Sequence, residues 1–477
     1  MHRSITPTRL VELIGAFDRT PAYLGLADAL TLLIGDGRIA LDVRLPSERD
    51  LATALGVSRT TVTRAYASLV ESGFAVAVRG AGTFTRVPGG RSRAHDQALT
   101  PSPDESLIDL TCAAATAPPG IAEAYAAAVA ELPAYLGGHG YFPVGLPALQ
   151  AAIAATYDAR GLPTRPEQIM VTSGALGAAA IVARALVAPR DRVLVESPTY
   201  PNGADALRRV GARFVAAPVE PDGWDVDGMV ATVRASRPAS AYLLVDFQNP
   251  TGLVMPAQDR RRLGSALTRA GTVPIVDEAH QALALDGQEM PPPFAAFAPG
   301  TVTLGSASKA FWGGLRIGWV RVPDQVTMDR LVDARLGLDL GAPLVEQLAL
   351  THLLAAPEAT RAAHIARLRT QREALVTALR ERLPTWEFRV PSGGMCVWCR
   401  LPAPLATPLA AAAERAGVAI APGPIFSVEG GLERFVRIPW TRSGADLENA
   451  VEALARAWAG LRGRRPQPQP RDRVIVA

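Results

Sequence analysis

The only lysine in this chain of 477 residues is Lys309, because the other 48 of its 49 basic residues are arginines. Arginine stays protonated at any working pH, whereas a lysine amine can lose its proton and attack a carbonyl carbon. Lys309 closes the small, hydroxyl-bearing run Leu304-Gly-Ser-Ala-Ser-Lys309. The simplest interpretation is a chance survivor of a general Lys→Arg bias on a solvated face. The chemistry of an isolated amine instead predicts a Schiff-base lysine, provided that the chain also supplies its partners.

Pyridoxal phosphate is the cofactor that such a lysine would hold. It needs an acid for its pyridine nitrogen, donors for its phosphate and a flat group against its ring. Asp277 follows the apolar run Val273–Val276, so we expect its carboxylate at the carboxyl edge of a sheet. There it would keep the pyridine nitrogen protonated. A helix-capping aspartate is the alternative interpretation.

Other groups that the cofactor needs occur in a suitable order along the chain. Thr172-Ser173-Gly174-Ala175 separates an apolar run from an Ala-rich stretch, which predicts free N–H groups at a helix N-terminus suited to a phosphate. Small residues also serve ordinary strand-to-helix turns. Ser306, Ser308 and Arg316 are predicted to be further donors to the phosphate. Tyr200 is predicted to stack on the cofactor ring, and Asn249 to donate from its amide to the phenolic oxygen.

These side chains require a sheet to position them. Short apolar runs alternate with longer Ala-rich stretches, a pattern typical of strands buried on both faces of a parallel sheet. The runs are Ile169–Val171, Val193–Val195, Tyr242–Val245, Val273–Val276 and Val302–Leu304. The alternation predicts an α/β fold. Residues 344–383 are predicted to be mostly helical, and a smaller mixed segment follows.

A different arrangement, three helices and a hairpin, is predicted for the first 90 residues. Ser47 and Ser58 are expected to cap the second and third helices, and Gly56 to end the second. These two helices form a helix-turn-helix pattern. Two short strands around the turn Arg79-Gly80 would form a wing beside it.

The third helix begins Arg59-Thr60-Thr61-Val62-Thr63-Arg64, side chains suited to base edges and phosphates. Arg79 could follow the DNA backbone or enter a minor groove. Residues 1–93 contain 12 arginines and eight acidic residues, and so account for the whole formal net charge of +4. The helix start, the wing and the charge together predict contact with double-stranded DNA. A small helical adaptor with a solvated basic face is the alternative.

The motif Leu45-Pro-Ser-Glu-Arg-Asp-Leu-Ala, followed by Leu55-Gly-Val-Ser-Arg-Thr-Thr-Val and Gly73-Phe74, resembles the winged helix-turn-helix of the GntR family. The likeness covers about residues 22–90. It implies DNA contacts by Arg49, Arg59, Thr60, Thr61 and Thr63, with Gly80 in the wing.

The later motifs resemble the fold-type I aminotransferases over about residues 108–462. Asn249-Pro-Thr-Gly252, Asp277, Ser306-Ala-Ser-Lys309 and Arg316 match. Arg437 matches the arginine that binds a substrate α-carboxylate. A winged helix followed by a linker and this domain is the order of the MocR subgroup of GntR regulators, which implies a homodimer.

Two positions depart from the aminotransferase pattern. His280 stands where the family usually has a tyrosine that bonds the phenolic oxygen of the cofactor, and we expect its titration near neutral pH to perturb the cofactor differently. The segment Tyr141-Phe-Pro-Val144 replaces the common Tyr-Gly-Asp-Pro. Tyr141 still aligns with the tyrosine that reaches the phosphate bound by the partner subunit.

The sequence thus predicts four segments: a winged helix-turn-helix at 1–90, a linker at 91–107, an aspartate aminotransferase-like domain with large and small subdomains at 108–463, and a disordered tail at 464–477. Three cysteines cannot form a disulfide framework. With no apolar run long enough for a membrane span, we expect a cytoplasmic protein. The pair Cys396 and Cys399 lacks the second pair that a zinc site would need, so no metal site is predicted.

Two functions remain open at this stage. One is a transcription regulator that binds pyridoxal phosphate on Lys309 and senses an amino compound or the vitamer itself. The other is a working class I/II aminotransferase with a vestigial DNA-binding domain. The helix start at Arg59–Arg64, the concentrated positive charge and His280 favour the regulator.

Overall fold

The computed structural model describes residues 4–35, 39, 43–86 and 107–463. The predicted linker, apart from residue 107, and the predicted tail lie outside these residues. Within the described part of the chain, no helix is long and apolar enough to cross a membrane.

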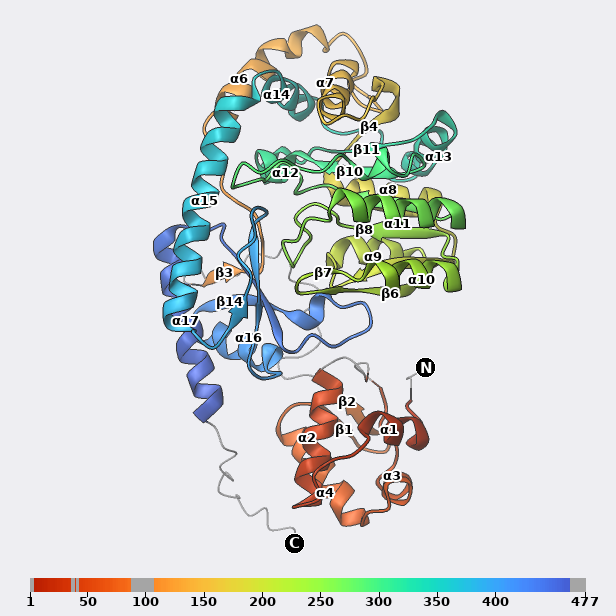
Figure 1. The fold of residues 1–477 in the computed structure, drawn as a ribbon, viewed down its shortest axis with the longest axis vertical. Coiled ribbons are helices and arrows are strands. Elements are labelled where there is room, and N and C mark those ends of the chain that lie inside the picture. The colour runs from red at the N-terminus through yellow and green to blue at the C-terminus, as the bar shows by residue number, and fades with distance from the viewer. Residues whose placement is uncertain (1–3, 36–38, 40–42, 87–106, 464–477) are drawn as a thin grey trace.

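The N-terminal domain contains one helix more than the sequence predicted (Figure 1). It consists of α1 (Pro7–Ile14), α2 (Ala22–Gly35), α3 (Glu48–Leu55), α4 (Arg59–Glu71), β1 (Ala75–Val78) and β2 (Gly82–Thr85). The missed helix α1 carried a local signal, because the Thr6 side chain accepts a hydrogen bond from the Arg9 amide and Pro7 stands at the first helical position. Leu10 from α1 lies in the same core as Leu30, Leu51 and Leu69.

The predicted caps of this domain are confirmed. The hydroxyl of Ser47 accepts a hydrogen bond from the Asp50 amide at 3.2 Å, and that of Ser58 accepts one from the Thr61 amide at 3.0 Å. Gly56 ends α3 in the left-handed conformation, with φ of 65°. The turn between α3 and α4 is therefore fixed by residues whose local chemistry the sequence shows.

The large subdomain is built on an eight-stranded sheet in the order β4-β11-β10-β9-β8-β5-β6-β7. Its strands are β4 (Ile169–Thr172), β5 (Arg192–Ser197), β6 (Arg213–Glu220), β7 (Gly223–Trp224), β8 (Ser240–Leu243), β9 (Val273–Asp277), β10 (Val302–Ser306) and β11 (Gly318–Arg321). The α/β fold is confirmed and all five predicted strands are present, although the bounds differ by one or two residues at several ends.

The five predicted strands run parallel to one another, as expected, but two strands that the apolar runs did not mark reverse direction: β11 runs antiparallel to both β10 and β4, and β7 runs antiparallel to β6. A parallel return needs a crossover of a dozen or more residues. Only residues 307–317 join β10 to β11, and they hold the short helix α12 (Ala307–Ala310) with Lys309 and the 3₁₀ helix η4 (Gly313–Leu315). The short connection forces the chain to reverse.

Helices cover both faces of this sheet, which explains the continuous apolar runs. Val193 and Val195 pack on the side of α8 (Gly174–Leu186), α9 (Pro201–Arg209) and α13 (Gln325–Leu336), whereas Leu194 packs on the side of α10 (Val226–Ser236) and α11 (Ala257–Ala270). Near β4, the sheet packs against α6 (Ile121–Glu131), α7 (Pro147–Asp158) and α14 (Leu344–Ala355).

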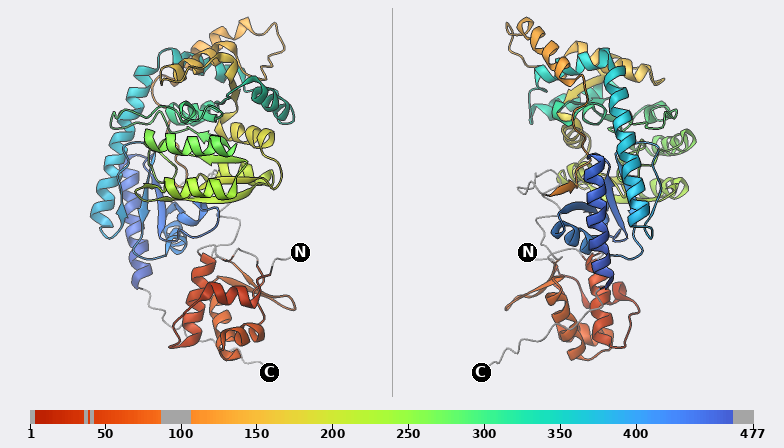
Figure 2. Two further views of the ribbon diagram at one scale, coloured as in Figure 1. Left: turned by 45° about the vertical axis from the view of Figure 1, so that its right-hand side comes forward. Right: turned by 90° about the vertical axis from the view of Figure 1, so that its left-hand side faces the viewer.

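The small subdomain has a five-stranded sheet in the order β12-β13-β15-β14-β3. Its strands are β3 (Ile108–Leu110), β12 (Glu387–Phe388), β13 (Cys396–Arg400), β14 (Val418–Pro422) and β15 (Phe435–Pro439). The helices α15 (Pro357–Arg382), α16 (Ala406–Arg415) and α17 (Gly444–Gly463) share its core, and α15 lies beside α17 in Figures 1 and 2. Strand β3 pairs with β14 in parallel, so the first residues after the predicted linker belong to a sheet otherwise formed near the C-terminus.

Candidate functional site

A cavity of about 360 Å³ lies where the large and small subdomains meet. Strands β4, β5, β8, β9 and β10 point their carboxyl ends toward the same edge of the large sheet, which is where ligands bind in folds of this kind. Ten of the predicted site residues line the cavity: Ala175, Tyr200, Asn249, Asp277, His280, Ser306, Ser308, Lys309, Arg316 and Arg437. The fold thus brings together residues spread over more than half of the chain.

The amine of Lys309 reaches the floor of this cavity from helix α12, directly after β10. Its Nζ donates a hydrogen bond of 2.5 Å to the carbonyl oxygen of Ala113. Burial lowers the pKa of Lys309 from its usual value, and the nearby positive charge of Arg437 lowers it further, although Asp277 opposes the shift. A lowered pKa increases the fraction of neutral amine, which is the nucleophilic form.

The carboxylate of Asp277 ends strand β9 and is almost fully buried. It accepts hydrogen bonds from the Tyr242 hydroxyl at 3.0 Å and from the Ala279 amide at 2.9 Å. Burial raises the pKa of Asp277, while the two hydrogen bonds and the charge of Lys309 pull it back down. Asp277 does not cap a helix, so the alternative interpretation of this residue is wrong.

Tyr242 is a site residue that the sequence did not reveal. It lies in strand β8, and its ring is fully buried on the face of the sheet shared with α8 and α9. The available signal was weak: a tyrosine inside an apolar run. Only the pairing of β8 with β9 brings its hydroxyl to Asp277.

The predicted phosphate cradle forms at the N-terminus of α8. Ser173 is the N-cap residue and its hydroxyl makes no capping hydrogen bond. Gly174 has φ of +81°, and a Cβ at this position would lie only 2.8 Å from Nη2 of Arg316, so a larger residue would fill the cradle. The Arg316 guanidinium reaches the carbonyl oxygen of Ser173 at 3.4 Å, and Ser306 Oγ accepts from the Ser308 amide at 3.2 Å.

Arg437 enters the cavity from strand β15. Its Nη1 donates to Asn249 Oδ1 at 3.2 Å, its Nη2 donates to the carbonyl oxygen of Thr111, and its guanidinium carbon lies 4.9 Å from the centre of the Phe426 ring. Among the described residues, its buried Nε has no hydrogen-bond partner. A buried donor without a partner is costly, and a ligand carboxylate would satisfy it.

Tyr200 and His280 also line the cavity. The Tyr200 hydroxyl accepts a hydrogen bond from Asn202 at 3.2 Å, and burial raises the pKa of Tyr200. Burial, together with the charges of Lys309 and Arg437, lowers the pKa of His280 to about 3. The expectation that His280 titrates near neutral pH is therefore wrong, because the imidazole of this buried histidine stays neutral above that pKa.

Tyr141 does not line the cavity. Its side chain is 56% exposed, and its ring stacks on His139 with a centroid distance of 5.7 Å. The predicted contact of Tyr141 with a partner subunit stays a prediction.

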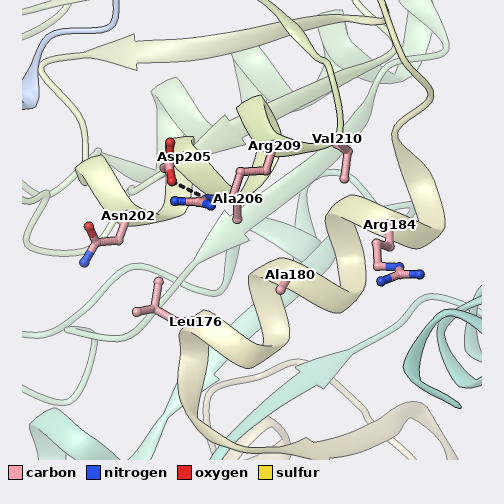
Figure 3. A pocket seen from close by; sticks show the side chains of 8 residues that line it. All are labelled: Leu176, Ala180, Arg184, Asn202, Asp205, Ala206, Arg209 and Val210. Atoms are coloured by element: carbon pink, nitrogen blue, oxygen red, sulfur yellow. Dashed lines mark hydrogen bonds and ion pairs between the residues drawn. The ribbon is translucent and has the colours of Figure 1, made fainter. Parts of the chain in front are cut away.

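A second hollow, of about 640 Å³, lies between α8 and α9 (Figure 3). Leu176 and Asn202 line both hollows, so the second one adjoins the cavity that contains Lys309. Arg209 pairs with Asp205 at 2.6 Å there, as the dashed line shows. Within the described residues, no group of His, Cys, Asp and Glu side chains is placed to hold a metal ion.

Most of the predicted DNA-contacting residues lie on the surface of the N-terminal domain. The side chains of Arg49, Ser58, Arg59, Thr60, Thr63, Arg64 and Arg79 are exposed, as is Gly80 at the β1–β2 turn, whereas Thr61 is partly buried. Ser58 and Thr61 contact one another through their hydroxyls at 2.8 Å, so both also shape the start of α4.

Three contacts, made by Glu48 and Tyr23, orient the predicted reading helix α4. Glu48 of α3 accepts a hydrogen bond from the Thr63 hydroxyl at 2.8 Å, and its carboxylate lies 3.5 Å from Nε of Arg59. The guanidinium of Arg64 lies 3.6 Å from the centre of the Tyr23 ring on α2. Neither Glu48 nor Tyr23 was among the predicted site residues.

Comparison with known proteins identifies both domains. Residues 119–454 match the family model described as aminotransferase class I and II, and residues 22–85 match that of the bacterial regulatory proteins of the gntR family. The uncharacterized HTH-type transcriptional regulator YdcR of Escherichia coli is 28% identical over 468 residues, which cover 91% of this chain and 98% of YdcR.

Two further similar proteins are a regulator and an aminotransferase. The probable rhizopine catabolism regulatory protein MocR of Rhizobium meliloti is 31% identical, covering 64% of this chain and 66% of MocR. Among solved structures, the α-aminoadipate aminotransferase LysN of Thermus thermophilus, complexed with N-(5'-phosphopyridoxyl)-L-leucine, is 30% identical with a TM-score of 0.68, covering 75% of this chain and 93% of LysN. The chain therefore belongs to the aminotransferase class I and II family and, with its gntR-family domain in front, to the MocR-type regulators.

Proposed function

We propose that this protein is a transcription regulator whose aminotransferase-like domain binds pyridoxal phosphate on Lys309 and senses an amino compound or the vitamer. One observation carries the proposal: the only lysine of the chain shares a cavity with Asp277 and Arg437. The exposed arginines of the predicted reading helix α4 support it. We place the domains at 1–90 and 108–463, and the regulator in the cytoplasm with its DNA.

The residues of the cavity fit the cofactor. Lys309 would hold it covalently, Asp277 would pair with its pyridine nitrogen, and the cradle at Ser173, Gly174 and Ala175 would receive its phosphate together with Arg316. Ser306 and Ser308 would add hydroxyls to the cradle, Tyr200 would stack on the ring, and Asn249 and His280 would donate to the phenolic oxygen. When bound, the cofactor supplies an electrophilic carbon and an electron sink.

The ligand class follows from the arginine opposite the lysine. Arg437 has a buried Nε without a partner among the described residues, and this N–H would donate a hydrogen bond to a ligand carboxylate. An amine next to a carboxylate would then face Lys309. The effector that fits best is an amino acid or a close analogue, while the vitamer alone would use only the cofactor cage.

An apolar surface around Tyr141 supports the proposed homodimer. The large side chains exposed there come from the segment 136–141 and from the end of α13 with the residues that follow it, and they are Leu136, Tyr141, Leu336, Leu338 and Leu340. The two segments are joined because Arg335 Nη1 donates to the carbonyl oxygen of Pro143 at 2.8 Å. Such a surface favours a buried position against a second copy, and from it Tyr141 would reach the partner.

Footprinting on the DNA upstream of the chain's own gene tests the regulator function. We expect a specific footprint that changes when pyridoxal phosphate, or the cofactor with an added amino acid, is present. Panels of amino acids and keto acids measure transamination in parallel. Fast transamination without a specific footprint would overturn the proposal and leave the alternative, an aminotransferase with a vestigial DNA-binding domain, which the complete cavity favours.

A further inference from the structure

The segment 109–117, which we call the strap, begins in β3, runs along the cavity and ends shortly before α6. Thr111, Cys112, Ala113 and Ala114 form part of the cavity wall. No motif in the sequence marks these residues, which are mostly small. The strap is held chiefly by cationic side chains that donate to its backbone carbonyl groups, and these fall into an outer and an inner pair.

The outer pair lies away from the cavity. Arg442 Nε donates to the carbonyl oxygen of Asp109 at 3.2 Å, at one end of the strap. At the other end, Arg367 of α15 donates to the carbonyl oxygens of Thr116 at 2.6 Å and Ala117 at 3.3 Å. Neither arginine lines the cavity, so a ligand there leaves both contacts in place.

The inner pair consists of Arg437 and Lys309, the cations proposed to bind ligand and cofactor. Arg437 donates to the carbonyl oxygen of Thr111, and Lys309 donates to that of Ala113 at 2.5 Å. The centre of the strap is therefore held by two donors that an occupant of the cavity would take over and by Thr441, whose hydroxyl donates a longer bond of 3.5 Å to the carbonyl oxygen of Cys112.

His364 links the outer anchor to the lysine. Its Nδ1 faces Nη2 of Arg367 at 3.0 Å, and its Nε2 lies 3.0 Å from the carbonyl oxygen of Lys309. A guanidinium can only donate, so Nδ1 of His364 accepts. Nε2 therefore carries the hydrogen and donates a hydrogen bond to the carbonyl oxygen of Lys309. His364 is buried and its pKa is lowered by burial, which keeps the neutral form that this relay requires.

We infer that the strap reports occupancy of the cavity to the DNA-binding domain. Condensation of the Lys309 amine with the cofactor aldehyde forms a C=N bond and releases water, made from the aldehyde oxygen and the two amine hydrogens. The carbonyl oxygen of Ala113 then no longer receives a hydrogen bond from the Lys309 amine. A ligand carboxylate would likewise compete with Thr111 for Arg437. Occupancy would leave the centre of the strap with the Thr441 contact alone, while Arg442 and Arg367 hold its ends.

The position of the strap in the chain makes this change useful. It continues from β3 (Ile108–Leu110), which follows the predicted linker at 91–107 directly. A change at the centre of the strap would reach the linker through β3, a three-residue strand paired with β14 at the edge of its sheet. The inference rests on the proposed function, and it adds the route by which the cavity would regulate DNA binding.

A spin label at the exposed Ala114 measures the mobility of the strap in the full-length protein. The variant Ala114→Cys is combined with Cys112→Ser; burial raises the pKa of Cys396 to about 11, and Cys399 is also buried, so neither thiol reacts readily. We compare Lys309→Ala, which removes the donor to Ala113, with Lys309→Arg, which keeps donors but cannot bond covalently to the cofactor. A label at exposed Ala159→Cys is the control.

Without cofactor, the label at residue 114 should be mobile in Lys309→Ala and restrained in Lys309→Arg and in the parent with Lys309. Pyridoxal phosphate should mobilise it in the parent alone, and the label at residue 159 should respond in none of them. Equal restraint in Lys309→Ala and Lys309→Arg would overturn the inference, because the lysine would then not hold the strap.

Affinity for the upstream DNA gives the second measurement. Without cofactor, the DNA affinity of Lys309→Ala should equal that of the cofactor-loaded parent, and the DNA affinity of Lys309→Arg should equal that of the cofactor-free parent. We expect these two affinities to differ by about fivefold or more. If pyridoxal phosphate changes the DNA affinity of the parent while the two variants bind DNA equally, the inference about the strap is wrong but the proposed regulator function is retained. If the parent neither takes up the cofactor nor protects DNA, the proposed function fails, and the cofactor-free label comparison still decides whether Lys309 holds the strap.

Discussion

The hydroxyl of Tyr242 donates a hydrogen bond of 3.0 Å to the carboxylate of Asp277, joining two neighbouring parallel strands beneath the cavity. Both groups are buried, and the bond stabilises the ionised carboxylate against the effect of burial. The charge that a protonated pyridine nitrogen would need is thus set by a residue that is not itself in the predicted cofactor cage.

Tyr242→Phe should therefore raise the pKa of Asp277, since the hydroxyl lowers it. The carboxylate is lost by protonation as the pH falls, so the variant should lose pyridoxal phosphate at a higher pH than the parent. Binding titrations across a pH series, followed by visible absorbance, measure this. If the variant and the parent lost pyridoxal phosphate at the same low pH, the role of Tyr242 would be contradicted.

Asp277→Asn is the stronger change at the same site. It removes the charge but keeps the size of the side chain, and a hydrogen bond to a charged group contributes roughly 1.5–3 kcal/mol. We expect the affinity for pyridoxal phosphate to fall by about tenfold to a hundredfold, measured by equilibrium dialysis. The matched control is Asp205→Asn, a surface carboxylate of the neighbouring hollow, which should bind the cofactor like the parent.

Lys309 is the only side-chain amine of the chain, so covalent attachment of the cofactor can be located without ambiguity. Borohydride reduction of the loaded protein should fix pyridoxal phosphate to a single peptide that contains Lys309, as mass spectrometry would show. Lys309→Ala should abolish the visible absorbance. Persistence of the colour in this variant would refute the central proposal.

The buried His280 should make the folded protein sensitive to acid. Its pKa is lowered to about 3 in the folded state and is near 6.5 when unfolded. Between these values the unfolded chain binds the extra proton, so stability falls as the pH drops below about 6.5, by up to about 1.4 kcal/mol per pH unit for this group.

His280→Gln removes this proton uptake but keeps a donor at the position. Denaturant unfolding from pH 7 to pH 4 should show a shallower loss of stability in the variant than in the parent. The same acid slope in both proteins would show that His280 is not the group responsible.

Ser58 has two roles that substitutions can separate. Its hydroxyl caps α4, and a lost cap costs about 1 kcal/mol, so Ser58→Ala should lower the stability of the N-terminal domain by that amount. Ser58→Asp can still cap the helix but places a negative charge at the predicted DNA surface. We expect near-parental unfolding with clearly weaker DNA binding, measured by fluorescence anisotropy. DNA affinity equal to that of the parent in Ser58→Asp would remove Ser58 from the interface.

The N-terminal domain was largely predictable because its signals are local. The caps Ser47 and Ser58 and the turn at Gly56 depend on side-chain and backbone preferences within a few residues. The helix α1 was missed although Thr6 and Pro7 carry the same kind of signal. The contacts of Glu48 with Thr63 and of Tyr23 with Arg64 could not be seen, because they depend on how helices distant in sequence pack.

For the larger domain, the sequence by itself determined the candidate chemistry: one lysine, and the residue types that a carbonyl cofactor needs, in the order that resembles the aminotransferases. Tertiary structure decided what surrounds that chemistry. The reversal of the chain at β11, the bond from Tyr242 to Asp277, the neutral state of His280 and the strap beside Lys309 all arise from residues brought together across the fold. Their environments are set by burial and by neighbours on other strands, which no pattern along the chain can show.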